Sequence, residues 1–392
     1  MKIITNQILI TGLALFAAVL LNSCKPIRDI KQTPLPYYGD NHFTCPAPAY
    51  AASKKNVFII ADKNGTEIFD MLAAFYLFNA TRKTNVYIVA RDRKPVVLRK
   101  NLFVLPQLTF RDVDSMKLEA DVIVIPALSA RTAFQDIVLI DWIKKHFHSF
   151  TKILAICDGA STAAATGLYD GKPMTCHASD YQAIKGQFPK VNWVQNVNVT
   201  SSGNLYSTAG VSNAVEGALT VINDLFDRQT MLKAAAAVYY PQAEIKTAHK
   251  SIAVSGSTKF NIAKKVICRK NKNTGVLLQE GMNEFWLASI IDTYGRSFPY
   301  SMSNFYLKDS TITTAYGLTI VCTQTIKPKK LHELHVSMPV LFSTEQTTYF
   351  SGAKIVRYDN QPAYPIDQCL RRIASLYGSK FENTVKILLD YN

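Results

Sequence analysis

The sequence predicts an α/β protein in which a parallel sheet is sandwiched by helices and is followed by a smaller, degenerate repeat of the same unit. Two observations predict this class. Short apolar runs of strand length alternate with segments of helical periodicity between residues 55 and 230. Four segments of the second half then recur in the order of four segments of the first half. With 392 residues, 48% of them hydrophobic, the chain is long enough to bury two such cores.

The first 24 residues have the composition of an export signal. A short basic start precedes the apolar run ILITGLALFAAVLL, which ends at Leu-Asn-Ser-Cys. The run is shorter than the roughly 20 apolar residues of a membrane-spanning helix, and it stops at a cysteine. This pattern resembles a bacterial lipoprotein signal. The resemblance implies that the thiol of Cys24 is lipidated and that the protein is held on the extracytoplasmic side of the bacterial cell envelope. The alternatives are an uncleaved N-terminal anchor or a chance apolar start.

Residues 25–54 are rich in proline, alanine and polar residues without periodicity, which is typical of a spacer. The first globular unit, residues 55–230, then begins with the strand-like run KNVFIIAD, a glycine-containing turn and the helical segment EIFDMLAAFYLFNATRK. Three further apolar runs, NVYIVARD, ADVIVIPAL and TKILAICDG, have the length of strands. Two helical segments, TAFQDIVLIDWIKKHFHSF and NAVEGALTVINDLF, lie between or after them.

Three segments that are distant in the chain converge in this arrangement. In open parallel sheets the ligand crevice lies beyond the carboxyl ends of the strands. Asp70, Ala127 and Cys157 all fall at that edge. The sequence therefore predicts a small-molecule site there.

Cys157 is the candidate nucleophile of this site. It ends a strand and opens a helix, whose unpaired N–H groups would lower the pKa of the thiol from about 8.5. Gly159 allows a close turn, so that elbow amides such as that of Asp158 can stabilise negative charge. The alternative is that Cys157 is a small hydrophobic residue at the end of a core strand.

The segments ILAICDGASTAAATGLYDGKPMTCH and LYSTAGVSNAVEGALTVINDLF resemble the ThiJ/PfpI family of the class I glutamine amidotransferase-like superfamily, most of all the ligand domains of AraC-type regulators. The resemblance covers about residues 55–230 and implies a flavodoxin-like fold. It also implies that Cys157 is the cysteine of a nucleophile elbow, that Asp70 is the carboxylate beside its sulfur, and that His177 is the histidine of a Thr-x-His motif.

The chain departs from this family at two places. Pro126-Ala127-Leu128 stands where the family has Pro-Gly-Gly, so Ala127 keeps its N–H for an oxyanion but not the close approach of glycine. Asp158 follows the elbow cysteine and would raise the pKa of the thiol if its carboxylate points inward.

The second half is expected to lack this chemistry. Residues 231–273 form a connection, and residues 274–392 form the degenerate repeat with two C-terminal helices. Trp286 stands at the counterpart of Asp70, and no cysteine elbow follows Pro339. We expect the repeat to pack against the first unit as an internal pseudo-dimer, with a homodimer as the alternative.

The charge and motif content of the sequence limit the classes of partner that the protein is expected to bind. The net charge of +15 is spread in short clusters without a helix-turn-helix or zinc-knuckle pattern, so no nucleic acid is expected. The chain has no CxxC or HExxH motif, so neither a metal nor a cofactor is expected. The disulfide state of five further cysteines stays open: Cys45, Cys176, Cys268, Cys322 and Cys369.

Two functions remain. One is a cysteine-dependent hydrolase, hydratase or lyase that acts on a small carbonyl, amide or isocyanide-like substrate, with Cys157, Asp70 and His177 as catalytic residues. The other is a non-catalytic protein that binds or senses a small molecule in the same crevice.

Overall fold

The computed structural model describes residues 34–39, 43, 48–99, 102–128, 133–242, 244–268, 272–306, 311–322, 331–358 and 362–391. The expected signal segment with Cys24, and Cys45 in the expected spacer, lie outside the described residues.

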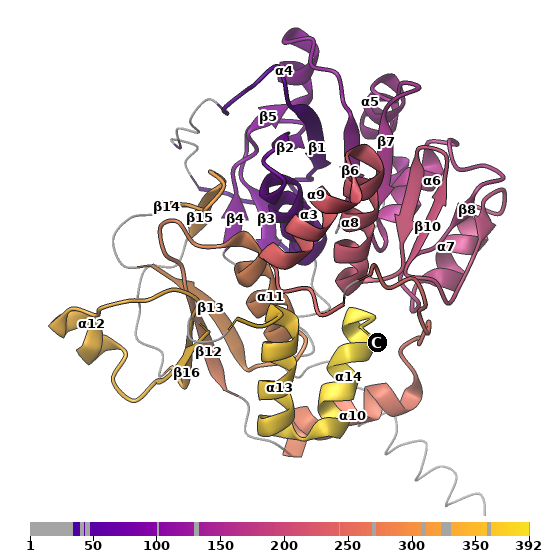
Figure 1. The fold of residues 1–392 in the computed structure, drawn as a ribbon. Helices are drawn as coiled ribbons and strands as arrows, with labels where there is room; N and C mark the ends of the chain where they lie inside the picture. Colours follow the sequence, from indigo (N-terminus) through magenta and orange to yellow (C-terminus); the bar gives the residue numbers. More distant parts are fainter. Residues whose placement is uncertain are drawn as a thin grey trace, which may run out of the picture.

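The main sheet confirms the predicted fold class. Within the described residues it has seven strands in the order β10-β11-β7-β6-β1-β2-β5, and all neighbours are parallel except β10 and β11. Figure 1 shows this sheet in the upper part of the molecule. The strands are β1 (Lys55–Ile60), β2 (Thr84–Ala90), β5 (Leu108–Thr109), β6 (Val122–Ile125), β7 (Lys152–Ala155), β10 (Val199–Ser202) and β11 (Leu205–Thr208).

Helices cover both faces of this sheet, because its central strands are apolar on both sides. Alternate residues of β1 belong to two different cores: Val57 and Ile59 to one, Phe58 and Ile60 to the other. The first core includes α3 (Ile68–Ala80), η2 (Val211–Asn213), α8 (Ala214–Leu225) and α9 (Arg228–Ala237). The second includes α4 (Phe110–Ser115), α5 (Ile137–Lys145), α6 (Gly159–Ala165) and α7 (Tyr181–Gln187). The short elements β8 (Pro173–Met174), β9 (Asn192–Trp193) and η1 (Ala133–Gln135) complete this unit.

The second half repeats the plan of the first at smaller size, as the sequence predicts. In its described part a parallel sheet has the order β13-β12-β16-β17, which matches β2-β1-β6-β7 of the main sheet. The helix between its first two strands begins in the same way in both halves: Glu67 accepts a hydrogen bond from the N–H of Asp70, and Asn283 accepts one from the N–H of Trp286. The elements are β12 (Asn273–Leu277), α11 (Glu284–Gly295), β13 (Ser301–Phe305), β16 (Glu333–Val336), α12 (Thr344–Tyr349) and β17 (Lys354–Arg357).

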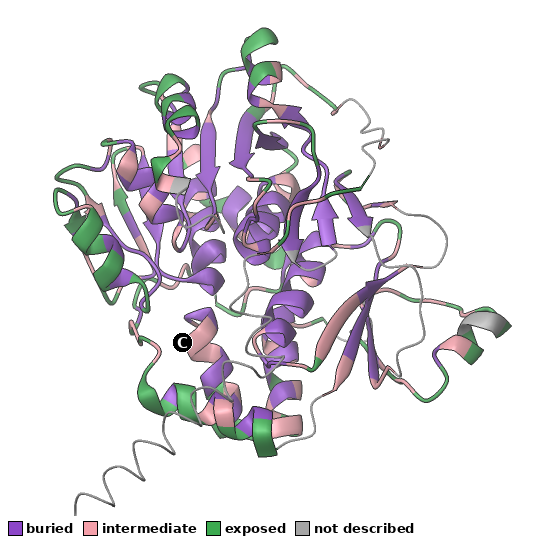
Figure 2. Cartoon of the chain, turned by 180° about the vertical axis from the view of Figure 1, so that it is seen from behind, coloured by how far each residue is buried: buried purple, intermediate pink, exposed green. Residues whose placement is uncertain are grey.

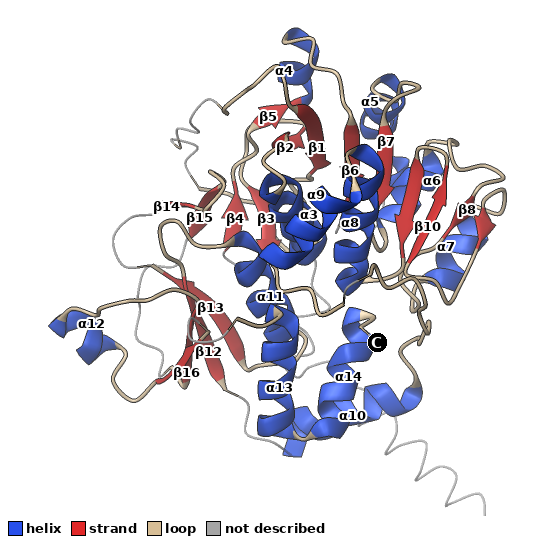
Figure 3. Ribbon diagram, viewed as in Figure 1, coloured by secondary structure: helices blue, strands red, loops and turns tan. Residues whose placement is uncertain are grey.

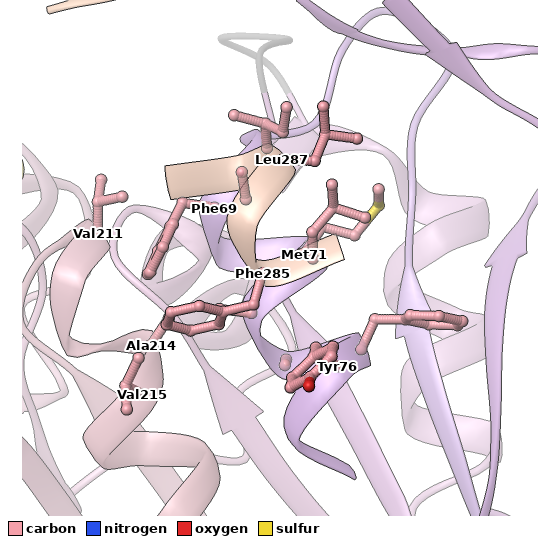
Figure 4. Close-up of a cluster of buried hydrophobic side chains, with 14 of the residues drawn as sticks. Phe69, Met71, Tyr76, Val211, Ala214, Val215, Phe285 and Leu287 are labelled. Atoms are coloured by element: carbon pink, nitrogen blue, oxygen red, sulfur yellow. The ribbon is translucent and has the colours of Figure 1, made fainter. Parts of the chain in front are cut away.

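The two halves share a core and a sheet. A hairpin from each half, β3 (Val96–Arg99) with β4 (Leu102–Val104) and β14 (Thr311–Thr313) with β15 (Thr319–Cys322), joins through antiparallel pairing of β4 with β15. Helices α3 and α11 pack side by side, and the rings of Phe69 and Phe285 lie 5.4 Å apart. Figure 4 shows these side chains with residues of α8 in one continuous apolar cluster. The repeat therefore packs against the first unit, as expected of an internal pseudo-dimer.

Three further helices gather at one end of the molecule (Figure 3). They are α10 (Gly256–Cys268), α13 (Pro365–Tyr377) and α14 (Ser379–Leu389), and α14 contacts both of the others. Within the described residues, no helix has the length and apolar character needed to cross a membrane.

Candidate functional site

The turn from β7 into α6 is a strained elbow centred on Cys157. Its φ of +55° lies in the left-handed region, which is uncommon for a residue with a side chain. A Cβ on Gly159 would lie 2.0 Å from the carbonyl oxygen of Ile125, so only glycine allows α6 to begin this close to β6. The structure therefore has the elbow that the sequence predicts.

Asp70 lies on α3 beside this elbow and is fully buried. Its Oδ2 accepts a hydrogen bond of 3.0 Å from the N–H of Ala127, while Oδ1 is buried without a hydrogen-bond partner among the described residues. Burial raises the pKa of Asp70 well above its usual value, and the nearby Glu67 raises it further. Burial therefore favours the neutral acid form of the carboxyl group. The N–H of Ala127, expected to serve an oxyanion, is engaged by Asp70.

The thiol of Cys157 is also held neutral. Only 3% of the residue is exposed, and this burial raises the pKa of the thiol well above its usual value. The carboxyl groups of Asp158, Asp70 and Glu67 raise it further, while a hydrogen bond from the Asp158 backbone opposes them. The sequence favoured a lowered pKa from the helix N-terminus. The structure gives the opposite direction, because burial and the carboxyl groups outweigh the helix end.

Asp158 has the inward orientation that the sequence analysis considered. Its Oδ1 is buried without a hydrogen-bond partner among the described residues. Burial and the neighbouring Asp180 raise the pKa of Asp158 to about 8. A second acidic group of the site is thus mainly protonated at neutral pH.

His177 is buried but turned toward other partners. Its Nδ1 accepts a hydrogen bond of 3.1 Å from the N–H of Ser179 and lies 3.7 Å from Oδ2 of Asp180. Burial lowers the pKa of the imidazole, so its neutral form is favoured. Cys157 and Asp70 are electrostatic neighbours, whereas the described contacts of His177 do not include the thiol.

The second half contributes a cation that sequence reasoning missed. Arg296, at the end of α11, donates from Nε to Oδ2 of Asp292 at 3.0 Å and from Nη1 to the carbonyl oxygen of Leu388 at 2.8 Å. Its Nη2 lies 3.5 Å from Oε1 of Glu67 in the first half. Burial opposes the charge, but Asp292 and Glu67 raise the pKa of the guanidinium. The only signal in the sequence was the expectation that the repeat packs against the first unit.

Asp390, at the end of α14, is an electrostatic neighbour of Asp158 and His177 in the candidate site. Oδ1 of Asp390 lies 2.9 Å from Nε2 of His249, and the backbone carbonyl of Asp390 accepts a hydrogen bond from Oγ of Ser212. A Cβ on Gly210 would lie 2.1 Å from the Cβ of Asp390, so the fit requires glycine. Sequence analysis assigned no role to these residues.

Four cysteines are free thiols in the described part of the chain: Cys157, Cys176, Cys268 and Cys369. Cys157 and Cys176 are therefore not paired with each other. Burial raises the pKa of the Cys176 thiol. Within the described ranges, no group of three or more histidine, cysteine or acidic side chains is arranged to hold a metal ion.

A parallel sheet covered on both faces, with a cysteine of positive φ just beyond the carboxyl end of β7, defines the first unit as an α/β domain with a sharp strand-to-helix turn at Cys157. Residues 54–224 match the model of the DJ-1/PfpI family. The match supports a DJ-1/PfpI domain in this part of the chain, which is less than half of its length.

Solved structures of low sequence identity are similar to the chain. A ThiJ/PfpI family protein from Pseudomonas syringae is 18% identical, with a TM-score of 0.44 over 60% of this chain and 94% of its own. A DJ-1 superfamily protein from Salmonella typhimurium is 21% identical, with a TM-score of 0.43 over 48% of this chain and 100% of its own. For DJ-1beta from Drosophila melanogaster the identity is 20% and the TM-score 0.42, over 47% of this chain and 97% of its own. No curated protein matches the chain.

Proposed function

We propose that the DJ-1/PfpI domain performs cysteine-dependent hydrolase, hydratase or lyase chemistry on a small carbonyl, amide or isocyanide-like substrate. One observation carries the proposal: Cys157 occupies a strained elbow next to the buried acid Asp70, whose Oδ1 has no hydrogen-bond partner among the described residues. Strain and buried polar atoms of this kind are retained where they serve function.

The protonation states define how the first step proceeds. With a carbonyl substrate, the sulfur of Cys157 forms a bond to the carbonyl carbon while the π bond to oxygen breaks. The protonated Oδ1 of Asp70 gives its proton to that oxygen, and the carboxylate that results takes the proton of the thiol. The product is a neutral hemithioacetal-type adduct, in which the former carbonyl carbon carries a hydroxyl group and the sulfur of Cys157. Asp70 is again protonated. Water then forms a bond to the same carbon as the C–S bond breaks, one proton of the water goes to the sulfur, and the hydrated carbonyl compound leaves the restored thiol.

The surroundings favour a neutral substrate. Glu67, Asp70 and Asp158 all lie near the thiol, and the charge of Arg296 is shared between Glu67 and Asp292. Protonation of Asp70 and Asp158 removes their charge, and the charges of Glu67 and Arg296 offset one another. The site therefore offers little net charge to bind an ionic substrate, which favours a small uncharged electrophile.

Specific observations also support the second function, a non-catalytic binding or sensor protein. The N–H of Ala127 is engaged by Asp70, and Cys157 is almost fully covered. Such a site can hold a small ligand without turning it over.

Turnover separates the two functions. Small aldehydes, amides and isocyanides are incubated with the wild-type protein, with Cys157→Ser and with Asp70→Asn, and consumption is followed by mass spectrometry. If the protein is an enzyme, the wild type should consume one of these three classes of substrate, and both substitutions should abolish that consumption. Binding detected by calorimetry without consumption would favour the sensor function, and consumption retained by Cys157→Ser would exclude Cys157 as nucleophile.

We further propose that the protein is a lipoprotein of the bacterial cell envelope, anchored through Cys24 on the extracytoplasmic side. The apolar run that ends at Leu-Asn-Ser-Cys supports this. In cells, Cys24→Ala should move the protein out of the lipid-modified fraction. Unchanged metabolic labelling with a fatty acid would contradict lipidation.

A further inference from the structure

Helix α10 presents an apolar and basic face to solvent. Phe260 and Ile267 are each 67% exposed, and since they are seven residues apart they lie on the same side of the helix. Lys264 is exposed between them, and Lys259 is exposed at the border of the same face. Figure 2 shows this helix at one end of the molecule, with much of its surface exposed.

The opposite face of α10 fixes the helix to the fold. Thr258, Ile262 and Val266 are buried, and the helix contacts α14. Nζ of Lys265, also buried, donates to the carbonyl oxygen of Phe298 at 2.8 Å and lies 4.7 Å from the centre of the Tyr377 ring. The exposed apolar side chains are therefore held in place on a rigid helix and are not needed for its packing.

The sequence around α10 has charge of one sign only. Residues 245–279 contain no aspartate or glutamate, whereas the whole chain carries a net charge of +15. The basic residues of this segment are Lys246, Lys250, Lys259, Lys264, Lys265, Arg269, Lys270 and Lys272.

We propose that this face of α10 docks on the surface of an anionic lipid bilayer. Large apolar side chains flanked by lysines on one helical face are the pattern of a helix that lies in the membrane interface. Phe260 and Ile267 would enter the boundary of the acyl chains, and Lys259 and Lys264 would contact anionic headgroups. Nucleic acid would explain the lysines, but its phosphate surface offers no partner for the two apolar side chains.

Weak docking of α10 is sufficient to hold this face on the bilayer if the protein is already anchored there. In this respect the inference rests on the proposed lipidation of Cys24. Ten residues along the chain separate Cys24 from the first described residue, Pro34, and a chain of this length spans at most about 35 Å. A bilayer that holds the anchor is thus within reach of the folded part of the chain. Tethering raises the effective concentration of the surface, so a helix with two apolar side chains needs only modest affinity.

Fluorescence quenching by brominated acyl chains tests the docking independently of the anchor. The full chain with Phe260→Trp is mixed with vesicles of brominated phosphatidylglycerol and phosphatidylcholine, and the signal of the parent protein is subtracted. Ile137→Trp, at a 65% exposed position on α5, is the matched control. We expect quenching at position 260 and none at position 137. Adding Lys259→Gln and Lys264→Gln should increase the lipid concentration for half-quenching roughly 30-fold, at about 1 kcal/mol for each lysine.

Each of the first three outcomes below overturns the docking, and the fourth leaves it standing. Absence of quenching at position 260 in protein that floats with the vesicles would show that the anchor binds and α10 does not. Equal quenching at positions 260 and 137, or in vesicles without anionic lipid, would also contradict it. An emission change with duplex oligonucleotide instead of vesicles would assign the face to nucleic acid. The substitution Cys24→Ala can also be added to the Phe260→Trp protein. If the protein then no longer floats with the vesicles but is still quenched at high lipid concentration, only the anchor is lost and the docking of α10 is supported.

Discussion

Arg296 of the second half and Glu67 of the first half meet across the boundary between the two units, with 3.5 Å between Nη2 and Oε1. Glu67 also accepts a hydrogen bond from the N–H of Asp70 at the start of α3. The repeat lacks a counterpart of the Cys157 elbow, yet it supplies a partly buried cation that pairs with Glu67 beside the candidate site. The second half therefore contributes a charge to this region as well as apolar packing.

Arg296→Met should strongly destabilise the protein. It removes the cation that pairs with the buried carboxylate of Asp292 and the partly buried carboxylate of Glu67, at a cost of about 3 kcal/mol. Urea unfolding measures the change. Arg91→Met is the control, because Arg91 is half exposed where it pairs with Asp136, and there the loss should be at most about 1 kcal/mol. Equal effects of the two substitutions would contradict a buried ion pair.

Gly159→Ala should disrupt the elbow. The added Cβ would meet the backbone of Ile125 and Pro126, which cannot move aside as a side chain can. We expect a loss of at least about 1–3 kcal/mol in free energy of unfolding. Gly186→Ala, in helix α7, has nothing within 4 Å of the new atom and should be neutral or stabilising. A tolerated Gly159→Ala would mean that the elbow is looser than described.

Phe285→Ala tests the shared core of the two halves. The ring is buried at α11 and contacts Phe69 and Tyr76 of α3. Its removal should cost about 3–5 kcal/mol. Phe260→Ala, at an exposed position, should change stability by less than about 0.5 kcal/mol. A separate early unfolding transition of the second half in the wild-type protein, seen by hydrogen exchange, would contradict a single core.

The raised pKa of Asp158 predicts how stability depends on pH. With a pKa of about 8 in the folded state and about 4 in the unfolded state, the folded protein binds more protons between these values. The stability contributed by protonated Asp158 is fully present below about pH 4 and is lost as the pH rises through 8. Asp158→Asn should therefore stabilise the protein more at pH 8 than at pH 5, as measured by urea unfolding. The exposed Asp141→Asn is the control, and a difference independent of pH would contradict the assignment.

Local patterns were sufficient to predict part of this molecule. The strands of the main sheet follow from apolar runs such as that of β1, and the elbow follows from the small residues after Cys157. The repeat follows from recurring segments, because each segment folds by the same local rules. The hairpin sheet that joins β4 to β15 requires tertiary pairing, which neither hairpin encodes alone.

The electrostatics of the site depended on contacts distant in the sequence. Arg296 and Asp390 reach the site from the second half, and nothing in their own neighbours marks them. The direction of the pKa shift at Cys157 required its burial, which a helix N-terminus does not reveal. Sequence reasoning identified the residues of the elbow but not the balance of charges around it.

The central claim is that burial favours the protonated forms of two neighbouring groups, the thiol of Cys157 and the carboxyl group of Asp70. Alkylation of Cys157 by iodoacetamide, followed by peptide mass spectrometry as a function of pH, measures the thiol directly, with Cys157→Ser as the blank. The structure predicts a midpoint above about 8.5, the value of a free thiol, and a lower midpoint in Asp70→Asn, because Asp70 ionises before the thiol as the pH rises and its negative charge then raises the pKa of the thiol. A midpoint below that of a free thiol, or the same midpoint in both proteins, would contradict the account.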